Sequence, residues 1–406
     1  MSCKACKDSV QDQDWICCEV CDEWFHFKCC GVDPERIAAI VEFHCTACAS
    51  EHGPSTELFR SKRRRVQYNY AQLDKGVIEV NHTHMHVPHF LREWPPHPFA
   101  VVDGNSIPEL TAPVIIPAKD YATLGMEVPS NIDAQFVADT LGPDTPLPVV
   151  DVVTQNILPG WTLGAWVEYL SGGEHRKTYN VISLEFSRTK LKPLITRPQY
   201  VRERDLVDQL WPRDSPNKPE VGYYCLMGVA GSYTDFHVDF GGTSVYYHIV
   251  KGRKKFLFIP PTESNLRAYE RWCKDSKQQT IWFPDTLAKP QCHCVELQSG
   301  DTMLLPSGWI HAVYTPEDSF VIGGNFLSVE FLESHLRVAG LEERIATPKK
   351  FTFPSFRATL EYLRSDYAKY GIKDETQKLV DEYLRRHRVE KAEKPGEGAQ
   401  ASSEPN

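Results

Sequence analysis

The chain has 406 residues, of which 41% are hydrophobic and 24% charged, and its formal net charge is −9. This length favours two or three domains with a sizeable apolar core. The negative balance argues against general affinity for nucleic acid, because contacts with phosphates need a basic surface. The sequence contains no run of roughly 18 apolar residues and no hydrophobic region of a secretory signal at its start. We therefore expect neither a membrane span nor secretion.

Cysteines gather at the start of the chain, where nine of the 13 lie within the first 48 residues. Without a secretion signal, such a cluster favours zinc over disulfides. The spacing Cys-x2-Cys-x11-Cys-x2-Cys-x4-His-x2-Cys-x15-Cys-x2-Cys supplies eight ligands, enough for two tetrahedral zinc ions. It resembles a PHD finger, which we predict for residues 1–50. The resemblance implies that alternate pairs share a metal, with Cys3, Cys6, His26 and Cys29 on one zinc and Cys18, Cys21, Cys45 and Cys48 on the other.

Two tryptophans stand close to these predicted ligands. Some PHD fingers bind methylated lysine in an aromatic cage through cation–π attraction, and Trp15 and Trp24 match two walls of such a cage. The resemblance therefore implies histone-tail binding. One alternative is that Trp24 simply packs within the domain. In addition, only Met1 and Ser2 precede Cys3, where methyl-lysine readers usually carry a further aromatic residue.

The composition of residues 51–66 predicts a linker that ends in a basic stretch. This stretch contains Arg60, Lys62, Arg63, Arg64 and Arg65. Five basic residues in six predict either a nuclear localisation signal or a weak contact with DNA phosphates. A solvated linker is the alternative. We favour import into the nucleus, because a histone-binding domain works on chromatin.

Short apolar stretches and many prolines in residues 67–145 predict an α+β extension of the domain that follows. Within it, His82, His84 and His86 alternate, so on a strand they would share one face. No carboxylate or thiol is spaced to complete a metal site with them. We therefore expect an exposed surface strand here and no metal.

Residues 146–330 alternate short β-type stretches with Gly and Pro turns, which favours a sandwich or barrel. We predict a mainly β fold with added helices, a double-stranded β-helix of the jelly-roll kind. Thr162 is predicted to cap a helix through Tyr169, and residues 263–275 form a helical insert. Strands are predicted at 180–186, 223–230, 237–240, 243–250, 254–260, 293–297, 302–306, 311–314 and 319–327.

One of these predicted strands carries a His-x-Asp pair. His237 and Asp239 are two residues apart, so on a strand both side chains leave the same face. His311 offers a third ligand 74 residues later, a separation that a jelly roll can close in space. Two His and one carboxylate with other positions open are the arrangement of non-haem Fe(II) oxygenases. A bare His-x-Asp pair is common, so further features are needed.

Lys254 is such a feature, because it begins a strand that is apolar on both faces. A lysine inside a barrel needs an anion, since an unpaired buried charge is costly, and a carboxylate of 2-oxoglutarate would provide one. A lysine that reaches water from the strand end is the alternative. Thr234 could share the carboxylate. It lies three residues before His237, however, so a bulge would have to bring it to the same face.

Three stretches resemble JmjC histone lysine demethylases: 234–248 (TDFHVDFGGTSVYYH), 306–316 (PSGWIHAVYTP) and 323–327 (GGNFL). The resemblance spans roughly residues 145–350, and its closest branch is the PHD-plus-JmjC histone demethylation proteins that act on lysine 36 of histone H3. It implies an enzyme that uses Fe(II), 2-oxoglutarate and O2. The implied iron ligands are His237, Asp239 and His311, and the implied 2-oxoglutarate contacts are Thr234, Lys254, Tyr247 and Asn180.

Other functions stay open at this point. They are demethylation of histone lysine 9 or 27, stable hydroxylation of a non-histone protein, and a catalytically inactive chromatin reader. Residues 331–390 change to helical spacing, with helices predicted at 336–341, 358–370 and 376–388 that would cover the barrel or mediate self-association. The charged residues 391–406 are predicted to be disordered.

Overall fold

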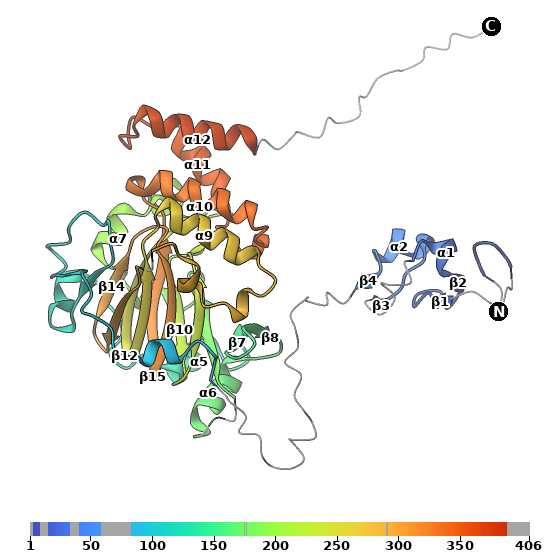
Figure 1. Cartoon of the computed structure of the whole chain (residues 1–406), viewed down its shortest axis with the longest axis horizontal. Helices are drawn as coiled ribbons and strands as arrows, with labels where there is room; N and C mark the ends of the chain where they lie inside the picture. Colours follow the sequence, from blue (N-terminus) through green and yellow to red (C-terminus); the bar gives the residue numbers. More distant parts are fainter. Residues whose placement is uncertain are drawn as a thin grey trace, which may run out of the picture. The chain divides into compact units, whose positions relative to one another are not determined.

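A computed structural model describes residues 3–8, 15–32, 40–57, 83–173, 175, 177–289 and 291–387. The chain divides into two compact units, Met1–Ile78 and Glu79–Asn406, and many of their elements are labelled in Figure 1. The basic stretch 60–65, His82 and residues 391–406 lie outside the described residues, so what we predicted for them stays a prediction. No described helix combines the length and hydrophobicity needed to cross a bilayer.

The first unit is built from short elements around its cysteines. In its described part the elements are β1 (Trp15–Cys17), β2 (Trp24–His26), α1 (Phe27–Cys30), β3 (Ile40–Glu42), α2 (Thr46–His52) and β4 (Thr56–Glu57). β1 pairs antiparallel with β2, and β3 with β4. Phe25 and Phe43 meet edge to face in a small core, with ring centroids 6.3 Å apart. With so little apolar contact, metal held by the cysteines would supply much of the folding free energy of this unit.

The second unit is built on an eleven-stranded sheet. Its order is β5-β6-β14-β12-β15-β10-β9-β7-β8, with β11 paired to β15 and β13 paired to β12. The strands are β5 (Ala100–Val101), β6 (Val114–Ile116), β7 (Val149–Asp151), β8 (Asn156–Leu158), β9 (Tyr179–Glu185), β10 (Tyr224–Gly228), β11 (Tyr233–His237), β12 (Ser244–Ile259), β13 (His293–Gln298), β14 (Thr302–Leu305) and β15 (Ile310–Phe326).

The predicted double-stranded β-helix is confirmed, and two long strands produce it. β12 pairs with β14 in its first half and with β13 in its second half, while β15 passes from β11 to β10. Both strands bend where the β12–β15 register shifts, around Lys251 and Arg253. Gly252 permits the bend, because its φ is +80° and a Cβ there would lie 2.1 Å from the carbonyl oxygen of Asp318.

Several predicted strand boundaries were wrong for this reason. The ranges 243–250 and 254–260 belong to the single strand β12, and 311–314 and 319–327 belong to β15. Turn residues interrupt the sequence pattern at these points. The hydrogen-bonded ladder nevertheless continues through the bend, because both strands bend together.

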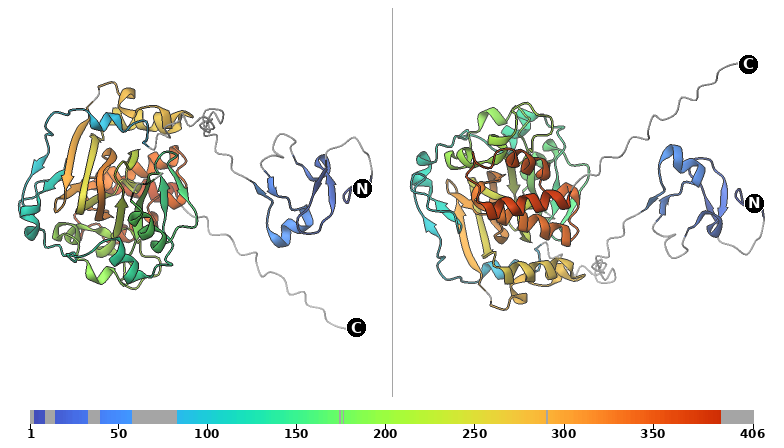
Figure 2. Two further views of the ribbon diagram at one scale, coloured as in Figure 1. Left: turned by 90° about the horizontal axis from the view of Figure 1, so that it is seen from below. Right: turned by 90° about the horizontal axis from the view of Figure 1, so that it is seen from above.

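Helices cover the two sides of the sheet. The α-helices of this unit are α4 (Pro88–Leu91), α5 (Ala134–Leu141), α6 (Leu163–Ser171), α7 (Gln199–Arg204), α8 (Leu206–Leu210), α9 (Glu263–Lys274), α10 (Leu332–Arg344), α11 (Phe356–Arg364) and α12 (Asp374–Arg386). Thr162 caps α6 as predicted, since its hydroxyl accepts from Ala165 N at 3.3 Å. α9 confirms the helical insert and packs on β11 and β12, whereas α5 and α6 pack on β9 and β10 (Figure 2).

Short 3-10 turns connect these elements. They are η2 (Ala118–Leu124), η3 (Lys192–Leu194), η4 (Phe240–Gly242), η5 (Gln278–Thr280), η6 (Phe283–Thr286), η7 (Val329–Phe331) and η8 (Lys349–Phe351). Among them, η4 is the one that matters for the site, because it follows the predicted His-x-Asp pair directly.

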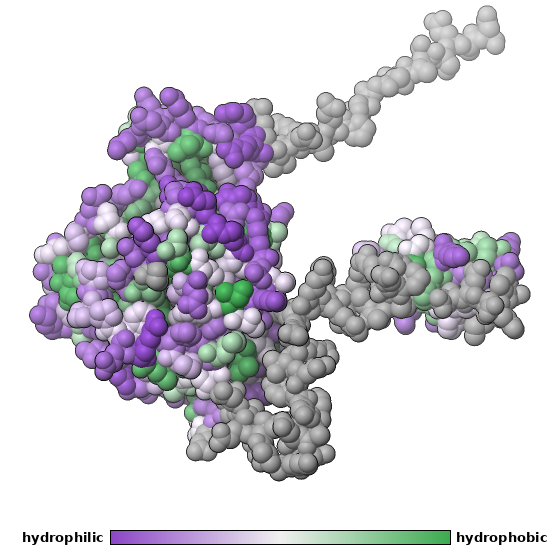
Figure 3. All heavy atoms as spheres, viewed as in Figure 1, coloured by the Kyte–Doolittle hydropathy of each residue, from purple (hydrophilic) through white to green (hydrophobic). Residues whose placement is uncertain are grey.

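The C-terminal part is helical, as predicted. α10, α11 and α12 share an apolar cluster with α8, in which Leu206, Leu360 and Val380 are buried. The outward side of α12 is largely hydrophilic in the view of Figure 3. These helices therefore bury their apolar stripes against the barrel unit.

The surface strand predicted around His84 and His86 was wrong. The two side chains are only 5% and 2% exposed, and the segment runs through a turn into α4. His84 stacks on Tyr233 with ring centroids 4.4 Å apart, and His86 lies 5.2 Å from Trp282. Burial lowers the pKa of both histidines to about 4. They pack as neutral rings, and among the described residues they form no metal-ligand cluster.

Candidate metal centre and co-substrate pocket

Three predicted ligands meet in the barrel. The ligand atoms of His237, Asp239 and His311 all lie within 4.8 Å of one another. His237 ends β11 and stands directly opposite His311 in β15, with ring centroids 4.2 Å apart. Nε2 of His311 is 3.9 Å from Oδ2 of Asp239. Two imidazoles and one carboxylate on one side of a metal leave its remaining positions open.

The strand predicted over residues 237–240 was wrong. β11 ends at His237, and Asp239 immediately precedes η4. In that turn Gly241 and Gly242 have φ values of 58° and 59°, a conformation that glycine adopts at little cost. Asp239 therefore reaches the ligand cluster from the start of a turn, and not through the alternation of one strand.

Backbone carbonyls orient both imidazoles. Nδ1 of His237 lies 2.8 Å from the carbonyl oxygen of Asp235, and Nδ1 of His311 lies 3.1 Å from that of Trp309. A carbonyl can only accept, so each Nδ1 carries the proton and each Nε2 keeps a free lone pair. Burial, and then the nearby His237, hold the pKa of His311 well below its usual range. His311 is therefore neutral, as a metal ligand must be.

Asn325 holds the carboxylate of the set. Its side-chain amide donates to Oδ1 of Asp239 at 3.4 Å and to the hydroxyl of Thr243 at 2.8 Å. Burial raises the pKa of Asp239, and the nearby His237 and the hydrogen bond from Asn325 oppose that rise. The sequence reasoning did not single out Asn325, which lies within the stretch 323–327 that carried part of the family resemblance.

Lys254 lies inside the barrel and is 3% exposed. Its ammonium donates to the hydroxyl of Thr315 at 2.7 Å, and among the described residues no carboxylate pairs with it. Burial lowers the pKa of Lys254 to about 7. Lys255, one residue on, faces away from this pocket and is partly exposed. The alternative in which Lys254 reaches water therefore does not hold.

A bulge brings Thr234 to the side of the ligand cluster. Thr234 pairs with Val313 and His237 pairs with His311, so three steps along β11 match two steps along β15. The extra residue reverses the alternation, which is the bulge that the predicted role of Thr234 required.

Gly228 leaves room between the side chains of this pocket. A Cβ on Gly228 would lie 2.8 Å from Nζ of Lys254, 3.0 Å from Oδ1 of Asn180 and 3.2 Å from the hydroxyl of Thr315. Asn180 in turn donates to the hydroxyl of Thr234 at 3.4 Å, while its Oδ1 is buried without a partner. A cation, hydroxyls and amide groups around an open cradle suit a carboxylate. The residues present therefore fit 2-oxoglutarate as well as Fe(II).

Tyr247 has the surroundings of a core residue. It is 8% exposed, and its ring meets Phe256 edge to face with centroids 5.2 Å apart. Its predicted contact with the co-substrate stays a prediction.

Eight ligands of the first unit form two separate clusters. They are Cys3, Cys6, His26 and Cys29 in one cluster and Cys18, Cys21, Cys45 and Cys48 in the other. These are the two sets that the PHD resemblance implies, and each combines ligands suited to tetrahedral zinc. Burial opposes ionisation of Cys3, yet backbone N–H donors lower its pKa to about 6. The spare thiol of Cys30 donates to the carbonyl oxygen of His26 at 3.2 Å instead.

Trp15 and Trp24 share one face of the β1–β2 pair. Trp15 is opposite His26 and Cys17 is opposite Trp24, so the two indoles are diagonal neighbours. Trp15 packs on His26 with ring centroids 4.0 Å apart. Trp24 is 37% exposed. An exposed indole beside a packed one leaves an aromatic surface open to a ligand.

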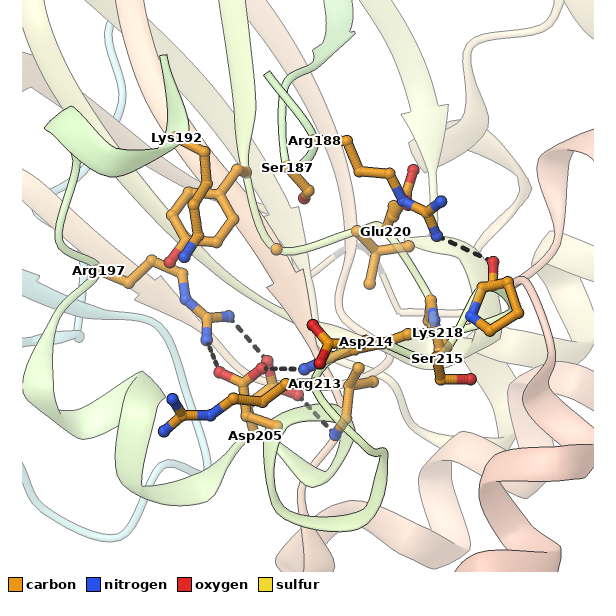
Figure 4. Close-up of a pocket in the computed structure, with 17 residues that line it drawn as sticks. Ser187, Arg188, Lys192, Arg197, Asp205, Arg213, Asp214, Ser215, Lys218 and Glu220 are labelled. Carbon is orange, nitrogen blue, oxygen red and sulfur yellow. Dashed lines mark hydrogen bonds and ion pairs between the residues drawn. The ribbon is translucent and has the colours of Figure 1, made fainter. Parts of the chain in front are cut away.

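A polar cavity of about 900 Å³ lies apart from the predicted residues (Figure 4). At its wall the guanidinium of Arg197, 2% exposed, donates to Asp205 at 2.7 Å and also pairs with Asp208. Lys218 pairs with Asp208 at 3.0 Å. This network joins α8 to the loop before β10, and we interpret it as structural.

Comparison with known proteins agrees with this geometry. Residues 224–326 match the family described as JmjC domain, hydroxylase, and residues 3–48 match the PHD-finger family. The JmjC domain-containing histone demethylation protein 1 of Yarrowia lipolytica is 40% identical over 371 residues, 86% of this chain and 72% of the relative. Its counterpart in Candida albicans is 38% identical over 396 residues, 88% of this chain and 82% of the relative.

A relative from another organism has a related name. The histone lysine demethylase PHF8 of Danio rerio is 37% identical over 362 residues, which cover 85% of this chain and 34% of the relative. The two family matches, the long relatives and the ligand cluster in the barrel agree with one another. The chain belongs to the JmjC histone lysine demethylases that carry a PHD finger.

Proposed function

We propose that this 2-oxoglutarate-dependent demethylase removes methyl groups from lysine 36 of histone H3. Fe(II) is held by His237, Asp239 and His311, and 2-oxoglutarate by Lys254, Thr234, Asn180 and Tyr247. One observation carries the chemistry: a set of two His and one carboxylate lies in a barrel beside a buried lysine that has no carboxylate partner among the described residues.

Bound Fe(II), with 2-oxoglutarate and O2, supplies the oxidation that hydroxylates an N-methyl group, which then leaves as formaldehyde. The chain binds and orients the reactants. His237, Asp239 and His311 would hold the metal, and three protein ligands would leave coordination positions for 2-oxoglutarate and O2. Lys254 neutralises a carboxylate in surroundings that largely exclude water. Asn325 keeps the Asp239 carboxylate aimed at the metal.

The choice of lysine 36 rests on the resemblance to the histone demethylation protein 1 branch. The relatives from Yarrowia lipolytica and Candida albicans carry that name and are aligned over more than two thirds of their own length. Lysine 9 and lysine 27 are the rival targets within histone H3.

We further propose that the PHD finger binds a histone tail and that the protein works in the nucleus. The support is the pair of indoles on one face of β1 and β2, with Trp24 exposed. An ammonium over such a face gains cation–π attraction. Two zinc ions would hold the strands that present these rings.

A panel of histone H3 peptides methylated at lysine 9, 27 or 36 tests the substrate. We expect a mass loss from the lysine-36 peptide, with succinate and formaldehyde released in equal amounts. The His237→Ala protein is the matched control and should release neither. Turnover of the lysine-9 or lysine-27 peptide alone would overturn the lysine-36 assignment. Turnover by His237→Ala would overturn the iron site.

A further inference from the structure

The turn that follows Asp239 is hydrogen-bonded to a helix about 100 residues later in the chain. The carboxylate of Glu342 in α10 accepts the backbone N–H of Gly241 at 2.7 Å. Nδ1 of His335, also in α10, donates to the carbonyl oxygen of Gly242 at 2.8 Å. His335 is 0% exposed and Glu342 is 8% exposed. Both bonds are therefore shielded from water, and both end on η4, the turn that follows Asp239.

Packing brings the turn close to the C-terminal segment. A Cβ on Gly241 would lie 2.8 Å from Cβ of Phe353, and a Cβ on Gly242 would lie 2.9 Å from Cβ of Val338. The positive φ of both residues adds to the demand for glycine. The close approach explains why η4 needs two glycines, and it shows that the turn packs tightly against Val338 of α10 and against Phe353.

His335 also reaches the second support of Asp239. Its Nε2 accepts the backbone N–H of Ser328 at 3.2 Å. Ser328 follows β15, the strand whose Asn325 donates to Asp239. Helix α10 thus holds two segments that support Asp239. One is the turn η4, which directly follows Asp239, and the other is the segment that follows Asn325, whose amide donates to the Asp239 carboxylate. Neither Glu342 nor His335 touches the ligand set itself.

We propose that α10 is a positioning element of the metal centre, with Glu342 and His335 holding the turn that aims Asp239. The inference rests on the metal site of the proposed function. It assigns α10 a part in positioning a metal ligand, beyond the covering or self-association expected of the C-terminal helices from the sequence. Groups that orient metal ligands without binding the metal commonly change metal affinity by 10–100-fold.

Binding of Mn(II) to the zinc-loaded chain of 406 residues tests the proposal without turnover. Free Mn(II) is followed by electron paramagnetic resonance during titration, and Mn(II) prefers carboxylate and imidazole over the thiolates of the finger. We expect Glu342→Ala to weaken Mn(II) binding by about tenfold or more. Glu342→Gln should bind like the wild type, because the amide oxygen accepts the same N–H. The exposed neighbour Glu343 provides the matched control, Glu343→Gln, which should also bind like the wild type.

The outcomes separate the inference from the site on which it rests. A folded Glu342→Ala protein with wild-type Mn(II) affinity would overturn the positioning role, even if its Tm were lowered. If Glu342→Ala does not fold, Glu342→Asp decides, because the shortened carboxylate no longer reaches Gly241. Wild-type affinity in that variant would overturn the inference equally. If the wild type binds Mn(II) no better than His237→Ala, the metal assignment itself fails, and the inference fails with it.

Discussion

At the scale of single residues, the site depends on a lysine, Lys254, that is buried away from water. Lys254 has a hydroxyl partner in Thr315 but no carboxylate among the described residues. Burial disfavours its charged form and lowers its pKa to about 7. A bound carboxylate would stabilise the charged form again. The protonation of Lys254 is therefore linked to the binding of 2-oxoglutarate.

We expect Lys254 to take up a proton from the solvent when 2-oxoglutarate binds at about pH 8. Above its pKa Lys254 is mostly neutral before binding, and beside the carboxylate it is charged. Below that pKa it is already charged, so uptake should fade at about pH 6. Titration calorimetry in buffers of different ionisation enthalpy measures the uptake. Lys254→Arg, which stays charged, should show none, and Lys255→Ala should behave like the wild type. Equal uptake by Lys254→Arg would contradict the linkage.

The sequence predicted the residues with distinctive chemistry but not those that support them. The spacing of His237, Asp239 and His311 led to a ligand set whose atoms do meet. Thr315 and Gly228 were not predicted, because a hydroxyl and a glycine in a strand have many ordinary uses. Their roles depend on which distant strands the fold brings beside Lys254, and spacing along the chain does not reveal this.

At the scale of elements, helix and strand types were predictable where one periodicity dominates, as in α9 and α12. Predicted strand boundaries were wrong where pairing with a distant strand continues through residues that usually form a turn. Gly252 looks like the end of a strand, yet β12 continues because β15 bends with it. Burial of His84 and His86 was equally hidden, because Tyr233 and Trp282, which cover them, come much later in the chain.

The buried ion pair that secures α8 should matter for stability. Arg197→Met leaves Asp205 buried without its partner, and we expect it to lower the free energy of unfolding by about 3–5 kcal/mol. Urea denaturation measures this change. Arg253 pairs with Glu296 and Glu317 at the surface, so Arg253→Met is the control and should change little. Similar urea midpoints for the two variants would refute the structural importance of the Arg197 network.

At the scale of the whole molecule, two units share one chain. If the finger binds one part of a histone tail, the covalent link raises the effective concentration of the rest of that tail at the barrel. A short peptide around the target lysine lacks the part that the finger binds, so it gains nothing from this link.

Trp24→Ala should therefore lower kcat/KM for nucleosomes or long tails that carry the finger's mark, and leave a short peptide around the target lysine nearly unaffected. Kinetics on both substrates measure the difference. Val20, 39% exposed in the same finger, provides the control Val20→Ala, which should match the wild type on both. An equal loss on the short peptide would mean that Trp24 serves the barrel and not tail binding.

β15 carries His311, Thr315 and Asn325, which serve the metal, the Lys254 pocket and the Asp239 carboxylate respectively. Insertion or deletion of a single residue near the start of this strand would move its inward-facing side chains to the outward face. All three contacts would disappear in one event, whereas any point substitution removes one. Descendants of this barrel should therefore vary in length in the loops around β15 and keep the strand itself free of insertions.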